Sequence, residues 1–293
     1  MQTSIHQGTF MNYLIVGGNA VLGQQSILAI RKEDPEAYII STTSSEGIVQ
    51  GADETIGNVN LTDSKSIDTV IQKITRPLRA IVYVPARGPV GKPVQYANRE
   101  EYQESVNFSV IPMLRLTGAL SPEIALWFSG FMWLEPLMML YGPMIYTKIT
   151  MEQITLKHPD RFKCVRYGMF VSNSARGISI LSQKAISSGK YPEQEDYKKG
   201  WKASGKKFKD YFASVNAAEE EAVLAPLARS SVAYRSLETE DLQIGVKKAL
   251  FSETDPILNV VGDWYWEDDE LPEWPPEIEA KMDLIDSDLD RYL

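Results

Sequence analysis

The stretch that decides the fold is MNYLIVGGNAVLGQQSILAIRK, residues 11–32. Its first six residues form a short apolar run that ends at Gly17 and Gly18, and QQSILAIRK then has the apolar spacing of a helix. Gly17 and Gly23 permit a tight turn and close packing of helix on strand, and free N–H groups at the helix start suit a pyrophosphate. An ordinary strand-to-helix turn that binds no nucleotide fits the same pattern, and Ala20 stands where the dinucleotide-binding motif has a middle glycine.

Further apolar runs predict the rest of a sheet. We expect strands at residues 37–41, 80–88, 125–130, 162–168 and 257–266, another element at 58–63, and helical patterns at 66–74, 101–120 and 239–250. Strands that alternate with helices predict an α/β protein with a Rossmann-like, doubly wound parallel sheet, whose ligands bind outside the carboxyl ends of the strands. The residues that fall at such ends are Gly17, Ser41, Ala86, Ser129 and Gly168.

The segment YGPMIYTKITMEQI, residues 141–154, is the main candidate for chemistry. On one continuous helix, Tyr141 and Lys148 would lie about 20° apart in rotation, on the same face. A phenol beside a fixed ammonium can donate a proton, because the cation favours the phenolate that remains. Tyr146 is a rival donor on another face. An amphipathic helix with a surface lysine and half-buried tyrosines explains the same residues without chemistry.

The order of these segments resembles the short-chain dehydrogenase/reductase family from residue 11 to residue 266. The matching pieces are NLTDSKSID (60–68), VPARG (84–88), VNFSVIPMLRLTGALSP (106–122), KITMEQI (148–154), YGMFVS (167–172), TEDLQIGVKKAL (239–250) and LNVVGD (258–263). Ordinary members have Y-x-x-x-K, whereas Tyr141, Met144 and Lys148 match the Y-x6-K spacing of the enoyl-acyl carrier protein reductase branch. Phe131 stands where that branch has its other tyrosine, and the glycine turn is more similar to that of extended or atypical members.

The resemblance implies an NAD(P)H-dependent reductase that transfers hydride to a C=C or C=O bond. Tyr141 would donate the proton, Lys148 would hold the nicotinamide ribose and lower the pKa of the phenol, Ser129 would orient the substrate oxygen, and Asn107 would support the lysine through water. The implied cofactor-binding residues are Gly17, Gly18, Asn19, Val21, Leu22, Gly23, Ser41, Thr42, Asn60, Ala86, Gly88, Lys148, Gly168 and Val171.

The hydroxyl side chains of residues 41–44, with no acid among them, favour NADP(H) over NAD(H). Two other functions fit the altered motifs. One is a non-catalytic NAD(P)-binding sensor or scaffold, and the other is a nucleotide-sugar epimerase or dehydratase.

Three further parts of the chain have a predicted organisation. Residues 1–10 fit no element and are expected to be a tail. Residues 172–238 form an insertion, with a helical run at 208–228, that should cap the substrate site within the 11–266 domain. Residues 267–293 read as an acidic arm, first extended and then helical from Ile278, which packs on its own domain or on a neighbour.

Composition limits the partners and the compartment. The net charge of −9 opposes nucleic-acid binding, and no apolar run reaches the roughly 18 residues of a membrane span. With no signal pattern and a single cysteine, Cys164, a reducing cytoplasm fits. His6 and His158 lack metal-ligand spacing, so no metal site is expected.

The lysine-rich cluster at residues 198–209 suggests a carrier protein or a phosphate as its partner, although a solvated helix face or a flexible loop explains it more simply. We therefore expect a small-molecule or acyl-carrier-linked substrate, and a homo-oligomer that is a dimer or a tetramer.

Overall fold

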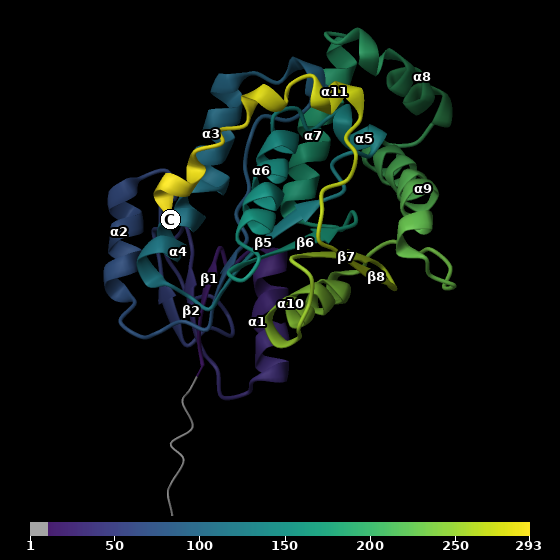
Figure 1. Ribbon diagram of the computed structural model, residues 1–293. Helices are drawn as coiled ribbons and strands as arrows, with labels where there is room; N and C mark the ends of the chain where they lie inside the picture. The colour runs from purple at the N-terminus through teal and green to yellow at the C-terminus, as the bar shows by residue number, and fades with distance from the viewer. Residues whose placement is uncertain (1–10) are drawn as a thin grey trace, which may run out of the picture.

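The sheet is the centre of the molecule (Figure 1). The computed structural model describes residues 11–293, apart from the side chains of residues 173 and 174, so the tail expected at residues 1–10 lies outside the described part. Eight strands lie in the order β3-β2-β1-β4-β5-β6-β7-β8, and all pair in parallel except β7 with β8. The strands are β1 Asn12–Val16, β2 Tyr38–Thr42, β3 Glu54–Ile56, β4 Ala80–Tyr83, β5 Ile124–Gly130, β6 Phe162–Tyr167, β7 Ile257–Val261 and β8 Trp264–Asp268.

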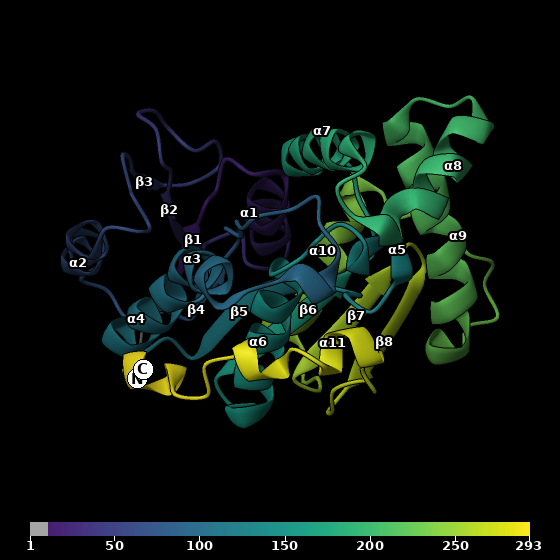
Figure 2. The ribbon, with the colours of Figure 1, turned by 90° about the horizontal axis from the view of Figure 1, so that it is seen from above.

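Helices cover both faces of this sheet, as the doubly wound prediction requires (Figure 2). One face carries α1 Val21–Glu33 and α10 Leu242–Phe251, and the other carries α2 Ser64–Lys73, α3 Arg99–Ser109, α4 Ile111–Leu120 and α6 Met144–Lys157. Alternate strand residues face opposite layers, so Tyr13 and Ile15 join the first core and Leu14 and Val16 the second.

The carboxyl ends of the inner strands lie level with one another. Val16 pairs with both Thr42 and Tyr83, and Gly130 pairs with Tyr167. The turns that follow these strands therefore share one edge of the sheet, which is the edge predicted to bind a ligand.

Three element predictions were wrong in detail. The element expected at 58–63 is a loop that contains the left-handed residue Asn58, and the third strand lies upstream at β3. The helix expected at 101–120 breaks at Val110, because Pro112 lacks an N–H and suits only the first turn of a new helix. The strand expected at 257–266 is a hairpin, β7 and β8, which turns back at Gly262 with φ of 55°.

The insertion is helical. It contains α7 Asn173–Ser188, α8 Glu195–Ser204 and α9 Phe208–Ala228, so the helix predicted at 208–228 is confirmed. In both views α8 and α9 lie at one end of the molecule, with the short helix α5 Glu135–Met138 next to α9, whereas α7 lies between them and α1 (Figures 1 and 2). The 3₁₀ turns along the chain are Val94–Tyr96, Pro192–Gln194, Thr239–Asp241, Met282–Leu284 and Leu289–Tyr292.

The C-terminal arm lies across the layer of α3, α4 and α6 (Figure 2). It packs on its own domain, but the helix expected from Ile278 onward is only the four-residue α11 Pro276–Glu279 followed by 3₁₀ turns. Ile278, Leu284 and Leu289 are buried there, and the Tyr146 hydroxyl donates to the Ile278 carbonyl over 3.1 Å. None of the helices within residues 11–293 has the length and hydropathy to cross a bilayer.

Candidate functional site

The turn between β1 and α1 requires its glycines. Gly17 has φ of +82°, in the left-handed region. A Cβ on Gly18 would lie 2.0 Å from Ser41 Oγ, and one on Gly23 would lie 2.5 Å from the carbonyl oxygen of Gly17. Only glycine at these positions lets the turn fold back so closely on β2 and on the first turn of α1.

The N-terminus of α1 is open to an anion. Ala20, at the N-cap, has no side chain that can accept from the first-turn amides, and no acid lies in that turn. The first N–H groups of a helix have no partner within it and carry a partial positive charge. Asn19 and Ala20 are exposed, whereas Leu22 is buried in the core, so Leu22 can offer a ligand only its backbone.

Two residues expected to contact the cofactor support the glycine turn instead. Ser41 is fully buried and its hydroxyl donates to the Ile15 carbonyl over 2.9 Å. Thr42 Oγ1 accepts from the Gly17 N–H at 3.3 Å. Thr43 and Ser44 follow the end of β2 at this edge and also carry hydroxyls. The Thr43 hydroxyl accepts from the Asn19 side-chain amide at 3.0 Å.

The loop after β4 contains Ala86, which is exposed, and Gly88, which is a packing residue. A Cβ on Gly88 would lie 2.6 Å from the sulfur of Met144 and 2.7 Å from Ser105 Oγ. Gly88 therefore allows this loop to press against α3 and α6.

The side chain of Asn107 is exposed and accepts from the Gln103 amide at 2.8 Å. It lines a cavity of about 450 Å³, together with Leu61, Thr62 and Arg87, and Lys148 is not part of that lining. The expected link from Asn107 to the lysine through water stays a prediction. Asn60 is exposed near the same cavity, and its Oδ1 accepts from Thr62.

Lys148 lies on α6 beside the end of β5. Its ammonium donates to the carbonyl oxygen of Phe128 over 2.6 Å, one residue before Ser129. Burial lowers the pKa of Lys148 to about 8, partly opposed by the nearby Cys164 and Glu152. Ser129 is half-buried at the strand end, and its hydroxyl reaches the carbonyl of Gly130 at 3.4 Å.

We predict that Lys148→Met raises stability near neutral pH, by up to about 3 kcal/mol. A lysine whose pKa is about 8 when folded and 10.5 in its ordinary state binds fewer protons in the folded protein between those values. Wild-type stability should therefore rise between pH 8 and pH 10, and this rise should disappear in Lys148→Met. Urea unfolding at several pH values measures it, and identical pH profiles for the two proteins would contradict the buried ammonium.

The structure separates Tyr141 from the helix that carries Lys148. The expected continuous helix is wrong, because α6 begins at Met144, after Gly142 with φ of 46° and Pro143. Burial alone raises the pKa of Tyr141 to about 12, with no contribution from a cation, so Lys148 does not lower it.

Met144 lies on α6 one turn before Lys148, where a Y-x-x-x-K motif would have its tyrosine. The rival donor Tyr146 is fully buried, and its hydroxyl binds the C-terminal arm. In this conformation no tyrosine hydroxyl among the described residues is paired with Lys148.

The turn after β6 contains Gly168 and, farther out, Val171, which is 85% exposed. The unexpected residue here is Glu220 of α9, a buried carboxyl that accepts from the Met169 N–H at 2.6 Å and from the Tyr234 hydroxyl at 2.9 Å. Burial raises the pKa of Glu220. A Cβ on Gly168 would lie 3.2 Å from Glu220 Oε2, so glycine relieves a tight contact here. Glu220 stands in a run of three glutamates, and nothing in the sequence distinguished it from its neighbours.

A second unexpected group is a buried ion pair behind the site. Arg166 of β6 donates to both carboxylate oxygens of Glu152, over 3.0 and 2.7 Å, and each side chain is 1% exposed. Arg166 also donates to Asp268 over 2.7 Å and to Asn259 over 3.3 Å. This network joins α6 to β6, β7 and β8. The Nε, Nη1 and Nη2 atoms of Arg166 all donate hydrogen bonds within it.

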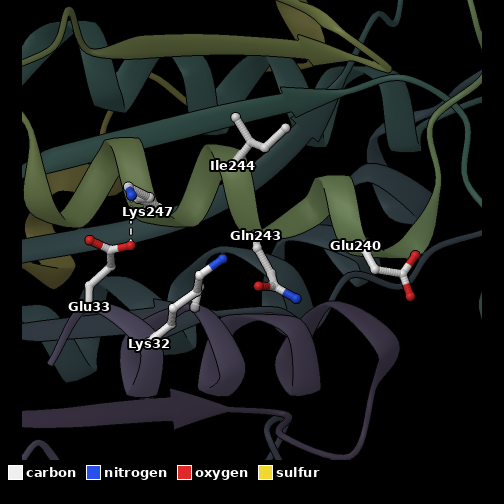
Figure 3. Close-up of a pocket in the computed structure, with 7 residues that line it drawn as sticks. Lys32, Glu33, Glu240, Gln243, Ile244 and Lys247 are labelled. Carbon is white, nitrogen blue, oxygen red and sulfur yellow. Dashed lines mark ion pairs between the residues drawn. The ribbon is translucent and has the colours of Figure 1, made fainter. Parts of the chain in front are cut away.

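A hollow of about 380 Å³ between α1 and α10 lies away from this edge (Figure 3). It is lined by Lys32 and Glu33, which stand at the end of α1 opposite the glycine turn, and Lys247 pairs with Glu33 over 2.7 Å. It therefore takes no part in the candidate site.

No protein-family model matches the chain, and no curated protein matches it either. Solved structures do resemble it. An L-sorbose reductase from Gluconobacter frateurii has a TM-score of 0.56 and 15% identity over 86% of this chain and 95% of its own. A short-chain type dehydrogenase/reductase from Mycobacterium ulcerans has a TM-score of 0.56 and 13% identity, covering 85% and 88%. A short chain dehydrogenase family protein from Francisella tularensis has a TM-score of 0.54 and 13% identity, covering 82% and 91%.

Proposed function

Because the chain has the short-chain dehydrogenase/reductase fold, we propose that it is an NAD(P)(H)-dependent oxidoreductase. The reaction would be hydride transfer to a C=O or C=C bond of a small or carrier-linked substrate. The observation that carries the proposal is the glycine turn before α1, where three glycines are needed and the first-turn amides are uncapped.

The residues present fit a dinucleotide. The backbone from Asn19 to Gly23 would hold the pyrophosphate, because the helix start offers N–H donors and no nearby acid repels the charge. Ala86, Gly168 and Val171 lie on turns at the same edge and would border the nucleoside parts of the cofactor.

NADP(H) is the cofactor we propose. Thr43 and Ser44 follow β2 where an acid would select NAD(H). Arg87, in the loop after β4, adds a cation: it is exposed, lines a cavity together with Leu61 and Thr62, and forms no ion pair within residues 11–293. The L-sorbose reductase structure contains NADPH.

When bound, the nicotinamide would supply or accept the hydride. Lys148, held at the end of β5, would bind its ribose, and Ser129 would donate to the substrate oxygen. Tyr141 would be the proton donor only after a movement of the 139–143 segment brings its hydroxyl toward the substrate, because it stands apart from Lys148 in the present conformation.

A non-catalytic NAD(P)-binding sensor is the second candidate. It is favoured by Met144, which cannot transfer a proton, and by the phenol of Tyr141, whose pKa is raised rather than lowered. In this case the cofactor site would remain and turnover would be absent.

Tyr141→Phe separates the two functions. If Tyr141 is the proton donor, the turnover of NADPH with a panel of ketones and enones should fall by about 100-fold or more, with little change in NADPH affinity. The control is Tyr211→Phe, which removes another hydroxyl from the aromatic cluster near Tyr141. Tight NADPH binding by the wild type with no turnover of any ketone or enone in the panel would favour the sensor.

The remaining expectations concern partners and compartment. A carrier-linked substrate is supported by the lysines of α8, although Lys198 and Lys199 are partly neutralised by Glu195 and Asp196 one turn away. The homo-oligomer and the cytoplasmic location stay predictions.

A further inference from the structure

Three segments of the chain meet at Gly91, in the loop after β4. The Gly91 N–H donates to the Leu140 carbonyl over 2.6 Å. The next residue, Lys92, pairs with Tyr141 in a parallel β-bridge. Gly91 has φ of +93°, and a Cβ on it would lie 3.0 Å from Ala185 Cβ on α7. The loop therefore contacts both the segment that contains Tyr141 and the helical insertion.

The side chain of Gln194 joins the same three segments. Gln194 ends the 3₁₀ turn that precedes α8, and it is 2% exposed. Its Nε2 donates to the Met139 carbonyl over 2.8 Å and to the Gly91 carbonyl over 3.1 Å. A side-chain amide has two N–H donors. Gln194 thus uses both of them to hold the insertion, the Tyr141 segment and the loop after β4 together.

Apolar packing holds the Tyr141 segment from the side of the insertion. Leu140 is fully buried in a cluster with residues of α7, α8 and α9, and Tyr141 packs against this cluster. The members from the insertion are Ile186, Trp201, Phe208 and Phe212. The insertion therefore fixes Tyr141 in its present position, which is before the start of α6 and apart from Lys148.

The hydrogen bonds of Gln194 favour this one conformation. If the amide were removed, the carbonyls of Met139 and Gly91 would each lose a donor, and a carbonyl left unpaired inside a protein is destabilising. A segment that leaves the junction exposes its carbonyl to water, which supplies the missing donor. Loss of the amide should therefore shift the population toward molecules in which the Tyr141 segment is released.

We propose that Gln194 is a positioning residue that holds the Tyr141 segment in a non-productive place, so that the insertion restrains turnover until it moves away from the loop after β4. This inference rests on the proposed oxidoreductase function and names how its site is regulated. When the active conformation is a minor state, the measured activity falls with the fraction of molecules that adopt it.

The test compares the wild type with Gln194→Met, which keeps much of the side-chain volume and has no N–H donor. Gln243→Met is the matched control, because Gln243 donates to Gln25 over 2.7 Å between α10 and α1, away from this junction. For each protein we would measure the melting temperature, NADPH affinity, NADPH oxidation with the panel of ketones and enones, and amide hydrogen exchange of residues 137–143. Hydrogen exchange reports the release of the segment even without turnover.

Tyr96→Phe is a milder variant of the same junction. The Tyr96 hydroxyl donates to Glu193, next to Gln194, over 3.0 Å, and Tyr96 is 39% exposed, so this variant should fold. It loosens the turn that carries Gln194 and leaves the amide itself in place. If Gln194→Met does not melt cooperatively, Tyr96→Phe decides the matter by the same measurements.

Gln194→Met should raise kcat by about tenfold or more, or produce turnover where the wild type has none, with unchanged NADPH affinity. Hydrogen exchange of residues 137–143 should become faster in this variant. Tyr96→Phe should change both quantities in the same direction by less, and Gln243→Met should match the wild type. Adding Tyr141→Phe to Gln194→Met should remove the gain in turnover, which a merely structural role of Gln194 would not predict.

Three results would overturn the inference: unchanged exchange of residues 137–143, a turnover that does not rise in Gln194→Met, or a gain that survives Tyr141→Phe. A wild type that fails to bind NADPH would instead remove the proposed function, and hydrogen exchange would still show whether Gln194 holds the segment.

Discussion

Glu152→Leu should lower the free energy of unfolding by about 3–5 kcal/mol, the usual loss when one member of a buried ion pair is removed. Glu152 and Arg166 are both 1% exposed and share two hydrogen bonds. Without Glu152, the guanidinium of Arg166 still binds Asp268 and Asn259. Asp268 is 31% exposed, however, so Arg166 loses its one fully buried carboxylate partner. Urea unfolding at neutral pH measures the loss.

Two comparisons sharpen this prediction. Asp68→Leu removes the exposed partner of Arg115, which it contacts at 2.7 Å, and should change stability by no more than about 1 kcal/mol. The double variant Glu152→Leu with Arg166→Met should recover much of the loss, because no buried charge is left on its own. If Glu152→Leu cost no more than Asp68→Leu, the buried network would not contribute as its geometry requires.

The largest effect on binding is expected from Ala20→Asp, which should weaken NADPH binding by about 100-fold or more, on the scale of 2.7 kcal/mol. Ala20 is an N-cap with extended backbone and no capping side chain. An aspartate there would accept from the first-turn amides of α1, and its charge would repel the pyrophosphate. The same capping should keep or raise stability, so a loss of binding cannot be attributed to unfolding.

Ala20→Ser is the matched control. Serine caps the helix in the same way but without charge, so NADPH affinity should fall much less than in Ala20→Asp. Equal affinities of the wild type and Ala20→Asp for NADPH would place the phosphates away from α1.

Most of the fold was predictable because short runs of neighbouring residues determine where its strands and helices form. Apolar runs that end in glycine or polar residues marked β1, β2, β4, β5 and β6, and the glycine turn fixed the first crossover. The errors arose where one residue changes the direction of the chain. Gly262 turns a single apolar run into a hairpin, and Pro112 divides one helical pattern into two helices.

The candidate site was predictable in its location and less so in its contacts. The glycines and Lys148 lie at the expected edge. The spacing between Tyr141 and Lys148 would place them on one helix face only if a single helix contained both residues. Gly142 and Pro143 lie between Tyr141 and the start of α6, so Tyr141 is not part of that helix. Contacts between residues far apart in the sequence could not be predicted from it. Glu220 binds the backbone of Met169, 51 residues earlier in the chain, and the Ser41 hydroxyl donates to the neighbouring strand β1.

The central claim is that the edge at the glycine turn binds a dinucleotide, and the most direct measurement is a calorimetric titration of the wild-type protein with NADPH and with NADH. The account predicts saturable binding at one site per chain, tighter for NADPH than for NADH, with the heat of binding lost in Ala20→Asp. No saturable heat with either nucleotide up to millimolar concentration, in a protein that unfolds cooperatively, would contradict it.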